Sequence, residues 1–357
     1  MGLDLRPALV AALSVALLPA NRLAAARSSD PDQPFIDAYR GAEPVTTWPL
    51  KRILHEVPGL KGLKPAPDQS ALPVALAKVA ARLESFWHNF QNTTSIETIE
   101  ESRELTNSPA AENERAVQRF RYLMLTDPAN PLQIKEYRTD LQGRARNSQP
   151  AASGFVRTSG FTSLPLVFGP NEQLITDYRD LGSQVLRERQ CRVLAFAQHI
   201  DPAGMSHWNI AGQEIPILVQ GVAWIDAAGG QVVQMRTDLL APQPRAGLHR
   251  ATTVVTFAPV QFHRLPATFW LPHEVSVSID LDRYTYTNRH YYTDYRLFAV
   301  LTSKLDLPIL SDGLGIDVPG PAPAWNESTG TGTWLADGPG LVTVGFRRKE
   351  LLSGIPG

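Results

Sequence analysis

Two short segments contain residue types that could act in catalysis. Ser206 lies in the stretch 204–208 (GMSHW), which partly matches the Gly-x-Ser-x-Gly turn that exposes the nucleophile of some hydrolases. The second glycine is missing, and the flanking sequence does not predict the strand and helix that this turn connects. The stretch 330–332 (GTG) lacks the Gly-Lys-Ser/Thr of a phosphate-binding loop. Spacing alone assembles no nucleophile and no acid–base pair, so we expect no enzymatic activity and no catalytic residue.

Residue types that bind metals are present without the spacing of a metal site. None of the eight His residues lies in an H-x-H or HExxH pattern, and His263 and His273, which flank one predicted strand, are far apart in the sequence. The single cysteine, Cys191, excludes a Cys-rich zinc site and an internal disulfide. Its place within a predicted strand favours a buried structural thiol. We expect neither a metal nor a cofactor.

The candidates for ligand binding are apolar and aromatic side chains spread along the chain. Methionine adapts to varied apolar ligands through its flexible thioether, and aromatic rings supply large apolar area. On one shared face such side chains would form the wall of a cavity, and the candidates are Phe86, Phe120, Tyr122, Met124, Met235 and Val277. The alternative is that they fill the interior completely, because close packing is the default in proteins. A dense run of aromatic residues over 284–298 leaves a similar choice, between cross-strand packing and a cavity lining.

A predicted helix over 70–90 would position Phe86. Ser70 fits an N-cap, Pro73 is tolerated in the first turn, and apolar residues recur at steps of three and four. The resulting apolar face must be covered by something large. We expect this helix to lie on the concave face of a sheet, with buried side chains at Leu76, Val79, Leu83 and Phe86 and exposed ones at Lys78, Arg82 and His88.

Between about residues 93 and 301, apolar residues alternate with polar ones, which is typical of antiparallel strands with one buried face. Clear examples are 233–239 and 275–281, and the pair Gly229-Gly230 predicts a hairpin. A sheet of this length twists and curls. The predicted fold class is α+β, with N-terminal helices packed on a long, curved antiparallel β-meander that forms an open half-barrel.

Composition indicates a folded chain with a large core. Of the 357 residues, 43% are hydrophobic and 19% are charged, which excludes disorder throughout. Lys and Arg total 34 against 35 for Asp and Glu, so we expect no nucleic-acid partner. The predicted organisation is a signal peptide over 1–26, a flexible linker over 27–46, the helix and antiparallel-sheet domain over 47–304, and a Gly- and Pro-rich, largely disordered tail over 305–357, in which 341–346 is the one candidate for a short edge strand.

Several local motifs together resemble a family of uncharacterised exported proteins of acidobacterial type, over about residues 47–301. These motifs are 57–66 (VPGLKGLKPA), 90–97 (FQNTTSIE), 221–226 (GVAWID), 235–240 (MRTDLL), 271–275 (LPHEV) and 288–298 (NRHYYTDYRLF). The resemblance implies export and carries no activity. A helix followed by an antiparallel meander is also similar in topology to the LolA/LolB-type lipoprotein carriers, which implies a curved open sheet with a cavity for acyl chains. The arginine characteristic of the carrier cavity has no matching motif here.

Two functions from different classes follow. The first is an exported envelope protein that acts as a non-catalytic structural or protein-interaction module, in which the apolar surface is simply core. The alternative is a carrier or binding protein for a lipid or acyl ligand in a half-barrel cavity. The expected partners are an envelope protein, or a lipid or acyl chain. The expected location is the periplasm or the outside of the cell, with no transmembrane span in the mature chain.

The mature chain should begin near Arg27. Arg6, an apolar stretch over 7–20 and the small residues Ala24 and Ala26 form the layout of a cleaved export signal. The apolar stretch is about 14 residues long, short of the roughly 20 that a membrane-spanning helix needs. The alternatives are an uncleaved anchor and an ordinary N-terminal helix. N-terminal sequencing of exported protein is the measurement, and an intact Met1 would contradict the prediction.

Overall fold

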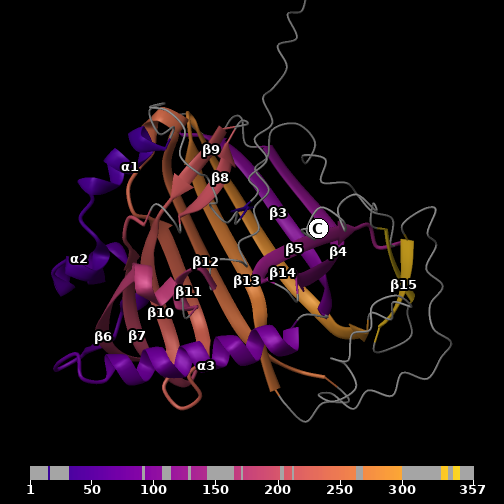
Figure 1. Ribbon diagram of the computed structural model, residues 1–357, viewed down its shortest axis with the longest axis horizontal. Coiled ribbons are helices and arrows are strands. Elements are labelled where there is room, and N and C mark those ends of the chain that lie inside the picture. Colours follow the sequence, from indigo (N-terminus) through magenta and orange to yellow (C-terminus); the bar gives the residue numbers. More distant parts are fainter. Residues whose placement is uncertain are drawn as a thin grey trace, which may run out of the picture.

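One long antiparallel sheet organises the chain (Figure 1). The structure is a computed structural model and describes residues 15–16, 32–90, 93–106, 114–127, 130–142, 165–169, 172–201, 205–210, 213–262, 268–299, 331–336 and 341–345. The main path of the sheet runs in the order β2-β6-β7-β10-β11-β12-β13-β14-β3-β4-β5, and a second, small sheet has the order β1-β8-β9. Within the described residues the ends β2 and β5 do not pair with each other, so the large sheet is open. The predicted α+β half-barrel class is confirmed.

The strands of the large sheet are β2 (Lys64–Pro65), β3 (Thr93–Leu105), β4 (Glu114–Asp127), β5 (Asn130–Thr139), β6 (Thr176–Leu186), β7 (Arg189–Gln198), β10 (Val219–Asp226), β11 (Val232–Leu239), β12 (Leu248–Gln261), β13 (Thr268–Leu281) and β14 (Tyr284–Ala299), with β15 (Thr331–Ala336) and β16 (Leu341–Gly345) off the main path. The small sheet consists of β1 (Val15–Ala16), β8 (Ser206–Ile210) and β9 (Gln213–Ile217). The helices are α1 (Gln33–Arg40), α2 (Leu50–Glu56), α3 (Leu72–Phe90) and α4 (Pro165–Phe168), and the short 3-10 turns are η1 (Val45–Thr47), η2 (Pro58–Leu60), η4 (Glu172–Ile175) and η5 (Pro244–Ala246).

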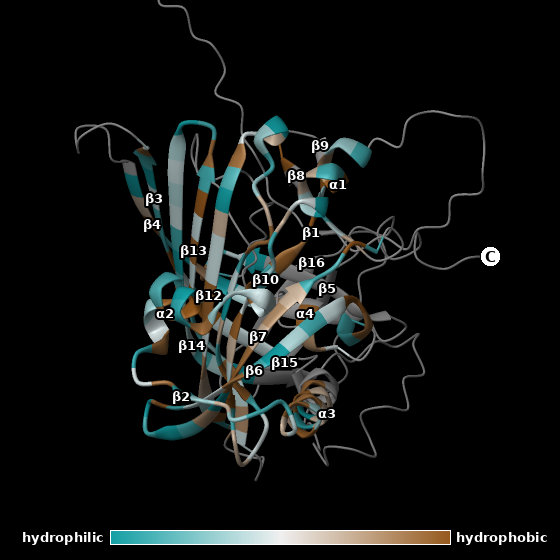
Figure 2. Cartoon of the chain, turned by 90° about the vertical axis from the view of Figure 1, so that its left-hand side faces the viewer, coloured by the Kyte–Doolittle hydropathy of each residue, from teal (hydrophilic) through white to brown (hydrophobic). Residues whose placement is uncertain are grey.

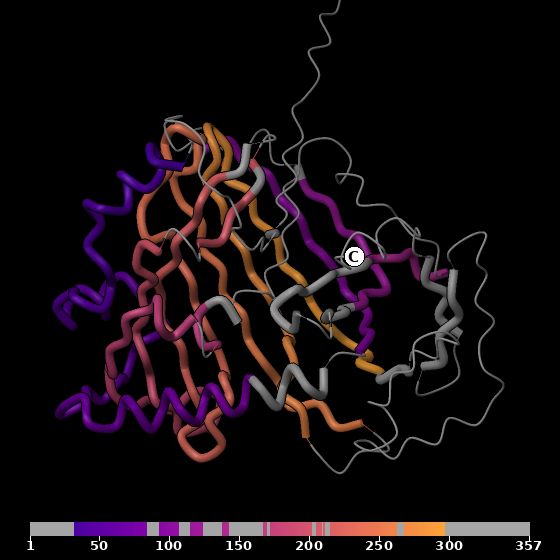
Figure 3. Tube along the Cα trace, in the orientation of Figure 1, coloured from indigo at the N-terminus to yellow at the C-terminus, as the bar shows by residue number. Residues whose placement is uncertain are grey.

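Strands that are far apart in the sequence lie side by side in the middle of the sheet. β14 pairs with β3, with Tyr284 opposite Leu105 at one end of the ladder and Leu297 opposite Thr93 at the other. Figure 3 shows these two segments next to each other, one early and one late in the chain. The meander β10–β14 therefore returns to the first hairpin of the sheet, and it brings residues near 97 and 290 together.

Successive side chains of a strand point to opposite faces of the sheet. Each face therefore has its own set of buried side chains, and different elements cover the two faces. On one face, strand residues such as Val193 and Trp224 pack with Ile53 of α2 and Leu60 of η2. On the other, here called the concave face, strand residues such as Phe196 cluster with side chains of α3, α4 and the β8–β9 hairpin. Figure 2 shows α2 on one side of the sheet and α3 and α4 on the other. The part of the sheet around β7 and β10 is thus buried on both faces.

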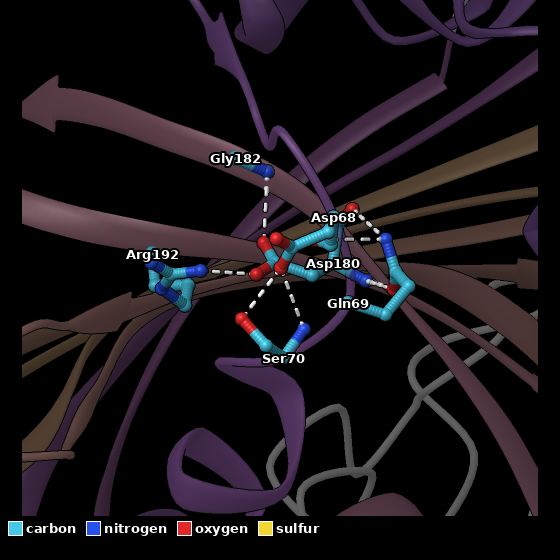
Figure 4. Close-up of polar contacts among 6 residues, drawn as sticks. All are labelled: Asp68, Gln69, Ser70, Asp180, Gly182 and Arg192. Atoms are coloured by element: carbon cyan, nitrogen blue, oxygen red, sulfur yellow. Dashed lines mark hydrogen bonds and ion pairs between the residues drawn. The ribbon is translucent and has the colours of Figure 1, made fainter.

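The start of α3 is fastened to strand β6 (Figure 4). Asp68 Oδ1 accepts hydrogen bonds from the backbone N–H of Ser70 at 2.8 Å and from its hydroxyl at 2.5 Å, which caps the turn before the helix. The side-chain amide of Gln69 donates to the carbonyl of Asp180 at 3.0 Å and accepts from its N–H at 2.7 Å. The amide of Gln69 thus pairs with the β6 backbone as a neighbouring strand would.

The Asp180 carboxylate holds the irregular part of β6 to which Gln69 binds. Its Oδ1 accepts from the N–H of Gly182 at 2.9 Å, and its Oδ2 accepts from the Arg192 guanidinium. The register of the β6–β7 ladder shifts between Asp180 and Gly182. Gly182 has a φ of +129°, and a Cβ there would overlap the backbone of Lys64 in β2. Only glycine therefore allows β2 to approach β6 this closely.

Further along, α3 is held against the turn between β10 and β11. Lys78 Nζ donates to the carbonyl of Ala227 at 3.3 Å, and Arg82 Nε donates to that of Gly229 at 2.7 Å. Gly230, with a φ of +75°, lies so close that a Cβ would be 2.8 Å from the Cβ of Lys78. Polar side chains on the exposed side of α3 therefore fasten the helix while its apolar side faces the sheet.

The predicted burial along α3 is confirmed where the side chains are described, with one exception. Val79 and Leu83 are buried and belong to the concave-face cluster, whereas Lys78 and Arg82 are exposed. Leu76 is half-buried instead of fully buried, because it packs at the margin of the cluster. The side chains of Phe86 and His88 lie outside the described residues.

One range differs from the expected organisation. The range 27–46, expected to be a flexible linker, contains α1, whose buried Phe35, Ile36 and Tyr39 bring one face of this short helix against the small sheet. The Tyr39 hydroxyl donates to the carbonyl of Pro216 at 3.0 Å. In the range 305–357, the candidate edge strand 341–346 is present as β16, which pairs with β15, and β15 pairs with β14. The rest of that range lies outside the described residues, and its disorder stays a prediction.

Replacing Leu83 of α3 tests the packing of this helix on the concave face. Leu83 is 4% exposed, so Leu83→Ala should lower the free energy of unfolding by about 2–5 kcal/mol, through lost burial and the cavity left behind. Val74, on the same helix, is 60% exposed, and Val74→Ala should change it by less than about 0.5 kcal/mol. Urea unfolding is the measurement. Equal effects of the two substitutions would mean that α3 is peripheral.

Candidate functional site: a buried carboxylate cluster

Strand register gathers a set of polar side chains on the concave face of β14, β3, β4 and β5. On β3, Glu97 lies opposite Tyr292 of β14 on one side and Phe120 of β4 on the other. On β4, Tyr122 lies opposite Arg138 of β5. His290, two residues before Tyr292, points to the same face. The side chains come from segments separated by almost two hundred residues, so only the folded sheet brings them together.

Glu97 is the centre of this cluster and binds three neighbours. Arg138 donates from Nε to Oε2 at 2.6 Å and from Nη2 to Oε1 at 2.9 Å. Oε1 also accepts from the Tyr292 hydroxyl at 3.0 Å and from His290 Nδ1 at 2.9 Å. The Glu97 and His290 side chains are completely buried, and that of Arg138 is 14% exposed. The carboxylate is therefore paired with a guanidinium in two-point geometry inside the protein.

The surroundings of Glu97 favour its charged form. Burial by itself raises the pKa of the carboxyl group, because the charged form loses its hydration. The charge of Arg138 and the hydrogen bonds from Arg138 and His290 act in the opposite direction and prevail, so the pKa of Glu97 lies well below its usual range. An ionised carboxylate only accepts hydrogen bonds. His290 Nδ1 and the Tyr292 hydroxyl must then be the donors.

His290 uses only one of its two ring nitrogens, Nδ1, in this cluster. Its Nε2 is buried and has no hydrogen-bond partner in the part of the chain that the structure describes. Such a group costs about 1–3 kcal/mol when nothing satisfies it. The imidazole lies parallel to the Tyr292 ring, with centroids 6.3 Å apart and planes at 10°, and its hydrogen bond to Glu97 orients it. Nε2 is a buried polar atom held in place with its hydrogen-bonding capacity unused.

Aromatic rings join the carboxylate cluster to the rest of the concave face. The rings of Tyr122 and Tyr292 meet edge to face at 5.3 Å, and the Arg138 guanidinium lies 5.3 Å from the Tyr122 centroid. Tyr122 and Tyr292 are also members of the apolar cluster that includes Met235 and Val277. The apolar part and the charged part of this face are therefore continuous.

The concave face is divided into an apolar half and a polar half. Over β7 and β10–β13 its buried residues are almost all apolar, including Phe196, Ile225, Met235, Val255 and Ile279. From β14 to β5 the buried side chains include ionisable and amide groups. These are Glu97, Glu101, Asn288 and His290, and Gln118 Nε2 donates to Glu101 Oε2 at 3.0 Å. Perturbed, buried ionisable groups gather at functional sites more often than elsewhere, although structural networks also contain them.

The structure places three of the four described members of the predicted ligand wall in one cluster. Tyr122, Met235 and Val277 belong to one buried cluster, and Phe120 is buried beside Glu97. The side chains of Phe86 and Met124 lie outside the described residues. All four described members are nearly inaccessible to solvent. The cavity between them stays a prediction.

Sequence reasoning missed the polar half, including Glu97, Arg138 and His290 as a group. Short spacings in the sequence do not reveal this group, because its three members meet only through strand register. One signal was present. In 93–101 (TTSIETIEE), the side chains that point inward from β3 include Ser95, Glu97 and Glu101. Charged residues therefore occupy positions that alternate with the outward-facing ones and are buried. A strand with carboxylates on its inner face needs partners for them.

The motifs that the sequence singled out for catalysis or metals are structural in the described part of the chain. Ser206 opens strand β8, which continues into the β9 hairpin and not into a helix. Cys191 is buried in β7, and burial, together with the charge of Asp226, raises the pKa of its thiol to about 11. His273 is exposed on β13, and His263 lies outside the described residues. Among the residues that are described, no three His, Cys, Asp or Glu side chains form a group that could hold a metal ion.

No helix in the described ranges combines the length and apolar character needed to cross a membrane.

Comparison of the sequence with known proteins finds no matching family model and no matching curated relative. Comparison of the fold finds solved structures that are similar at low identity. An outer membrane lipoprotein-sorting protein domain from Vibrio parahaemolyticus is 11% identical with a TM-score of 0.30, over 65% of this chain and 96% of that one. A DUF1329 family protein from Desulfovibrio piger is 10% identical with a TM-score of 0.34, over 66% and 94%.

A third similar structure is the MucA/MucB complex of Pseudomonas aeruginosa, at 13% identity and a TM-score of 0.20, over 64% of this chain and 100% of that one. At these values the likeness concerns the fold alone. Membership of the acidobacterial-type family stays a prediction.

Neutralising Glu97 tests the role of the buried ion pair in stability. Glu97→Gln leaves Arg138 without its counter-charge, so the free energy of unfolding at pH 7 should fall by about 3–5 kcal/mol. Glu100→Gln is the matched control, because Glu100 is exposed on the same strand, and its effect should stay within about 0.5 kcal/mol.

The pH dependence of this difference gives a second measurement. The pKa of Glu97 is lower in the folded chain than its ordinary value of 4.5, so the stabilisation is fully present above that value. It should be lost progressively as the pH falls further. The stability gap between the native protein and Glu97→Gln should therefore shrink in acid, as measured by urea unfolding. A gap that is unchanged down to about pH 3 would contradict a lowered pKa of Glu97.

Proposed function

We propose that this chain is an exported, non-catalytic binding protein that carries a lipid or acyl ligand on the concave face of its sheet. The observation that supports the proposal is the division of that face into an apolar half and a polar half, joined by Tyr122 and Tyr292. A ligand with an acyl chain and a polar head is divided in the same way. Its chain would lie on the apolar half and its head near Glu97 and His290.

The acyl chain would enter between α3 and the apolar half. The side of α3 that faces the sheet presents small and branched side chains, namely Ala75, Val79 and Leu83. The hydrogen bonds from Lys78 and Arg82 to the β10–β11 turn lie on the exposed side, where water can replace them at little cost. An entering acyl chain would replace the apolar contacts between α3 and the sheet with apolar contacts of its own to both. The half-buried Leu76 marks the margin where such a chain would first meet the cluster.

The contacts of Glu97 argue against a catalytic role for it. Its lowered pKa leaves no proton for it to give as a general acid. Both oxygens already accept hydrogen bonds from Arg138, His290 or Tyr292, so neither is available as a general base. These contacts suit a group that orients its neighbours. The expectation that the chain is not an enzyme is therefore part of the proposal.

The other function open from the sequence is a structural or protein-interaction module of the cell envelope. In that case the apolar half is core alone, and no ligand enters it. Both functions place the chain in the periplasm or outside the cell, as its N-terminal sequence predicts. The two are distinguished by whether an acyl ligand binds.

Binding of labelled ten-carbon ligands tests the proposal. We expect pyrene-labelled decanol, pyrene-labelled decanoic acid, or both, to bind the full mature chain saturably, as measured by fluorescence titration. Native mass spectrometry of protein purified from its own periplasm should show a bound lipid. Failure of both measurements would overturn the proposal and favour the interaction module.

Two substitutions on α3 locate the binding surface. Leu76→Trp places a bulky ring at the margin of the apolar cluster and should weaken binding at least about tenfold, because it occupies space the chain needs. Val74→Trp is the control, since Val74 is 60% exposed on the same helix, and should leave affinity unchanged. Equal affinities of the two variants would place the ligand elsewhere.

A further inference from the structure

The unused nitrogen of His290 is the feature of the polar half that the proposed function leaves unexplained. Nε2 is completely buried and lacks a hydrogen-bond partner among the described residues. It belongs to the same side chain that supports Glu97 through Nδ1 at 2.9 Å. A buried polar atom of this kind is kept where something completes it.

The chemistry of Nε2 follows from its neighbours. Glu97 accepts hydrogen bonds and cannot donate one, so the proton of the imidazole is on Nδ1. In neutral imidazole the other nitrogen then carries a lone pair and accepts a hydrogen bond. An atom that completes the neutral imidazole is therefore a hydrogen-bond donor.

The charge of the cluster indicates which donor fits. Glu97 carries one negative charge and Arg138 one positive charge, and they are joined by two hydrogen bonds. The pair leaves no net positive charge to attract an anionic head group. A carboxylate or phosphate would also bring acceptors to an atom that needs a donor. An uncharged hydroxyl meets both conditions.

We propose, on the basis of the concave-face binding described above, that the ligand carries an uncharged hydroxyl head group which donates a hydrogen bond to His290 Nε2. His290 is then the residue that determines head-group specificity. Glu97 orients the imidazole from one side, and the Tyr292 ring holds its plane. Long-chain alcohols and monoacylglycerols share this hydroxyl chemistry.

Three ligands with the same ten-carbon chain test this inference on the native protein. The probes are 1-decanol, decyl methyl ether and decanoate, each competing at pH 8 with pyrene-labelled decanol. We expect decanol to bind at least about tenfold more tightly than the ether, because the ether leaves Nε2 without a donor. Decanoate should bind more weakly than decanol. A monoacylglycerol with the same chain, compared with decanol, distinguishes the two sources of the hydroxyl group, and tighter binding of either one than of the ether supports the inference.

Substitution of His290 provides the second arm of the experiment. His290→Phe keeps a ring of similar size and should abolish the preference for decanol over the ether. His273→Phe makes the same change at an exposed position and should retain it. Should His290→Phe fail to fold, the comparison of ligands on the native protein still decides the question.

The outcomes separate the inference from the function on which it rests. Equal binding of decanol and the ether, or tightest binding by decanoate, would overturn the hydroxyl site while leaving the carrier function in place. Absence of saturable binding by every ten-carbon ligand would overturn both. Retention of the decanol preference in a folded His290→Phe variant would also overturn the assignment to His290.

Discussion

The buried charge of Glu97 is the constraint on which the polar half of the sheet depends. Its donors come from both sides, with Arg138 reaching across β4 from β5 and the donors His290 and Tyr292 lying on β14. A buried carboxylate without partners is very costly, so the four strands must keep this alignment. A slip of one residue would turn Glu97 to the outer face, because side chains alternate along a strand. The ion pair therefore specifies register in a part of the sheet where hydrophobic patterning is weak.

The division of the concave face also explains where the covering elements pack. α3, α4 and the β8–β9 hairpin present apolar side chains, which gain most from contact with the apolar half. Around β7 and β10 the opposite face is covered as well, by α2 and η2. Strand segments there are apolar at consecutive positions, as in 193–197 and 222–225, because both of their faces are buried. The sheet thus changes from a two-sided core at one end to a polar inner face at the other.

Local patterns in the sequence predict secondary-structure elements, but they do not predict the carboxylate cluster around Glu97. The helix over 70–90 and the Gly229-Gly230 hairpin follow from periodicity and turn chemistry, and both are present. The turn between β6 and β7 carries no such local signal, because Arg187 and Glu188 adopt φ values of 50° and 64° without the glycine that usually marks such a turn. The sequence predicts a linker where α1 lies, because the apolar face of this short helix becomes apparent only when it packs against the small sheet. Glu97, Arg138 and His290 could not be grouped, because strand register alone brings them together.

The single cysteine, Cys191, makes local opening of one face of the sheet measurable. Cys191 packs with Val193 and Trp224 under the layer formed by α2 and η2, and its thiol is protonated near neutral pH because burial raises its pKa to about 11. A thiol reagent reacts with the exposed thiolate, so modification must wait for that layer to open. Labelling rates on the native chain would measure local opening of this face without any engineered probe.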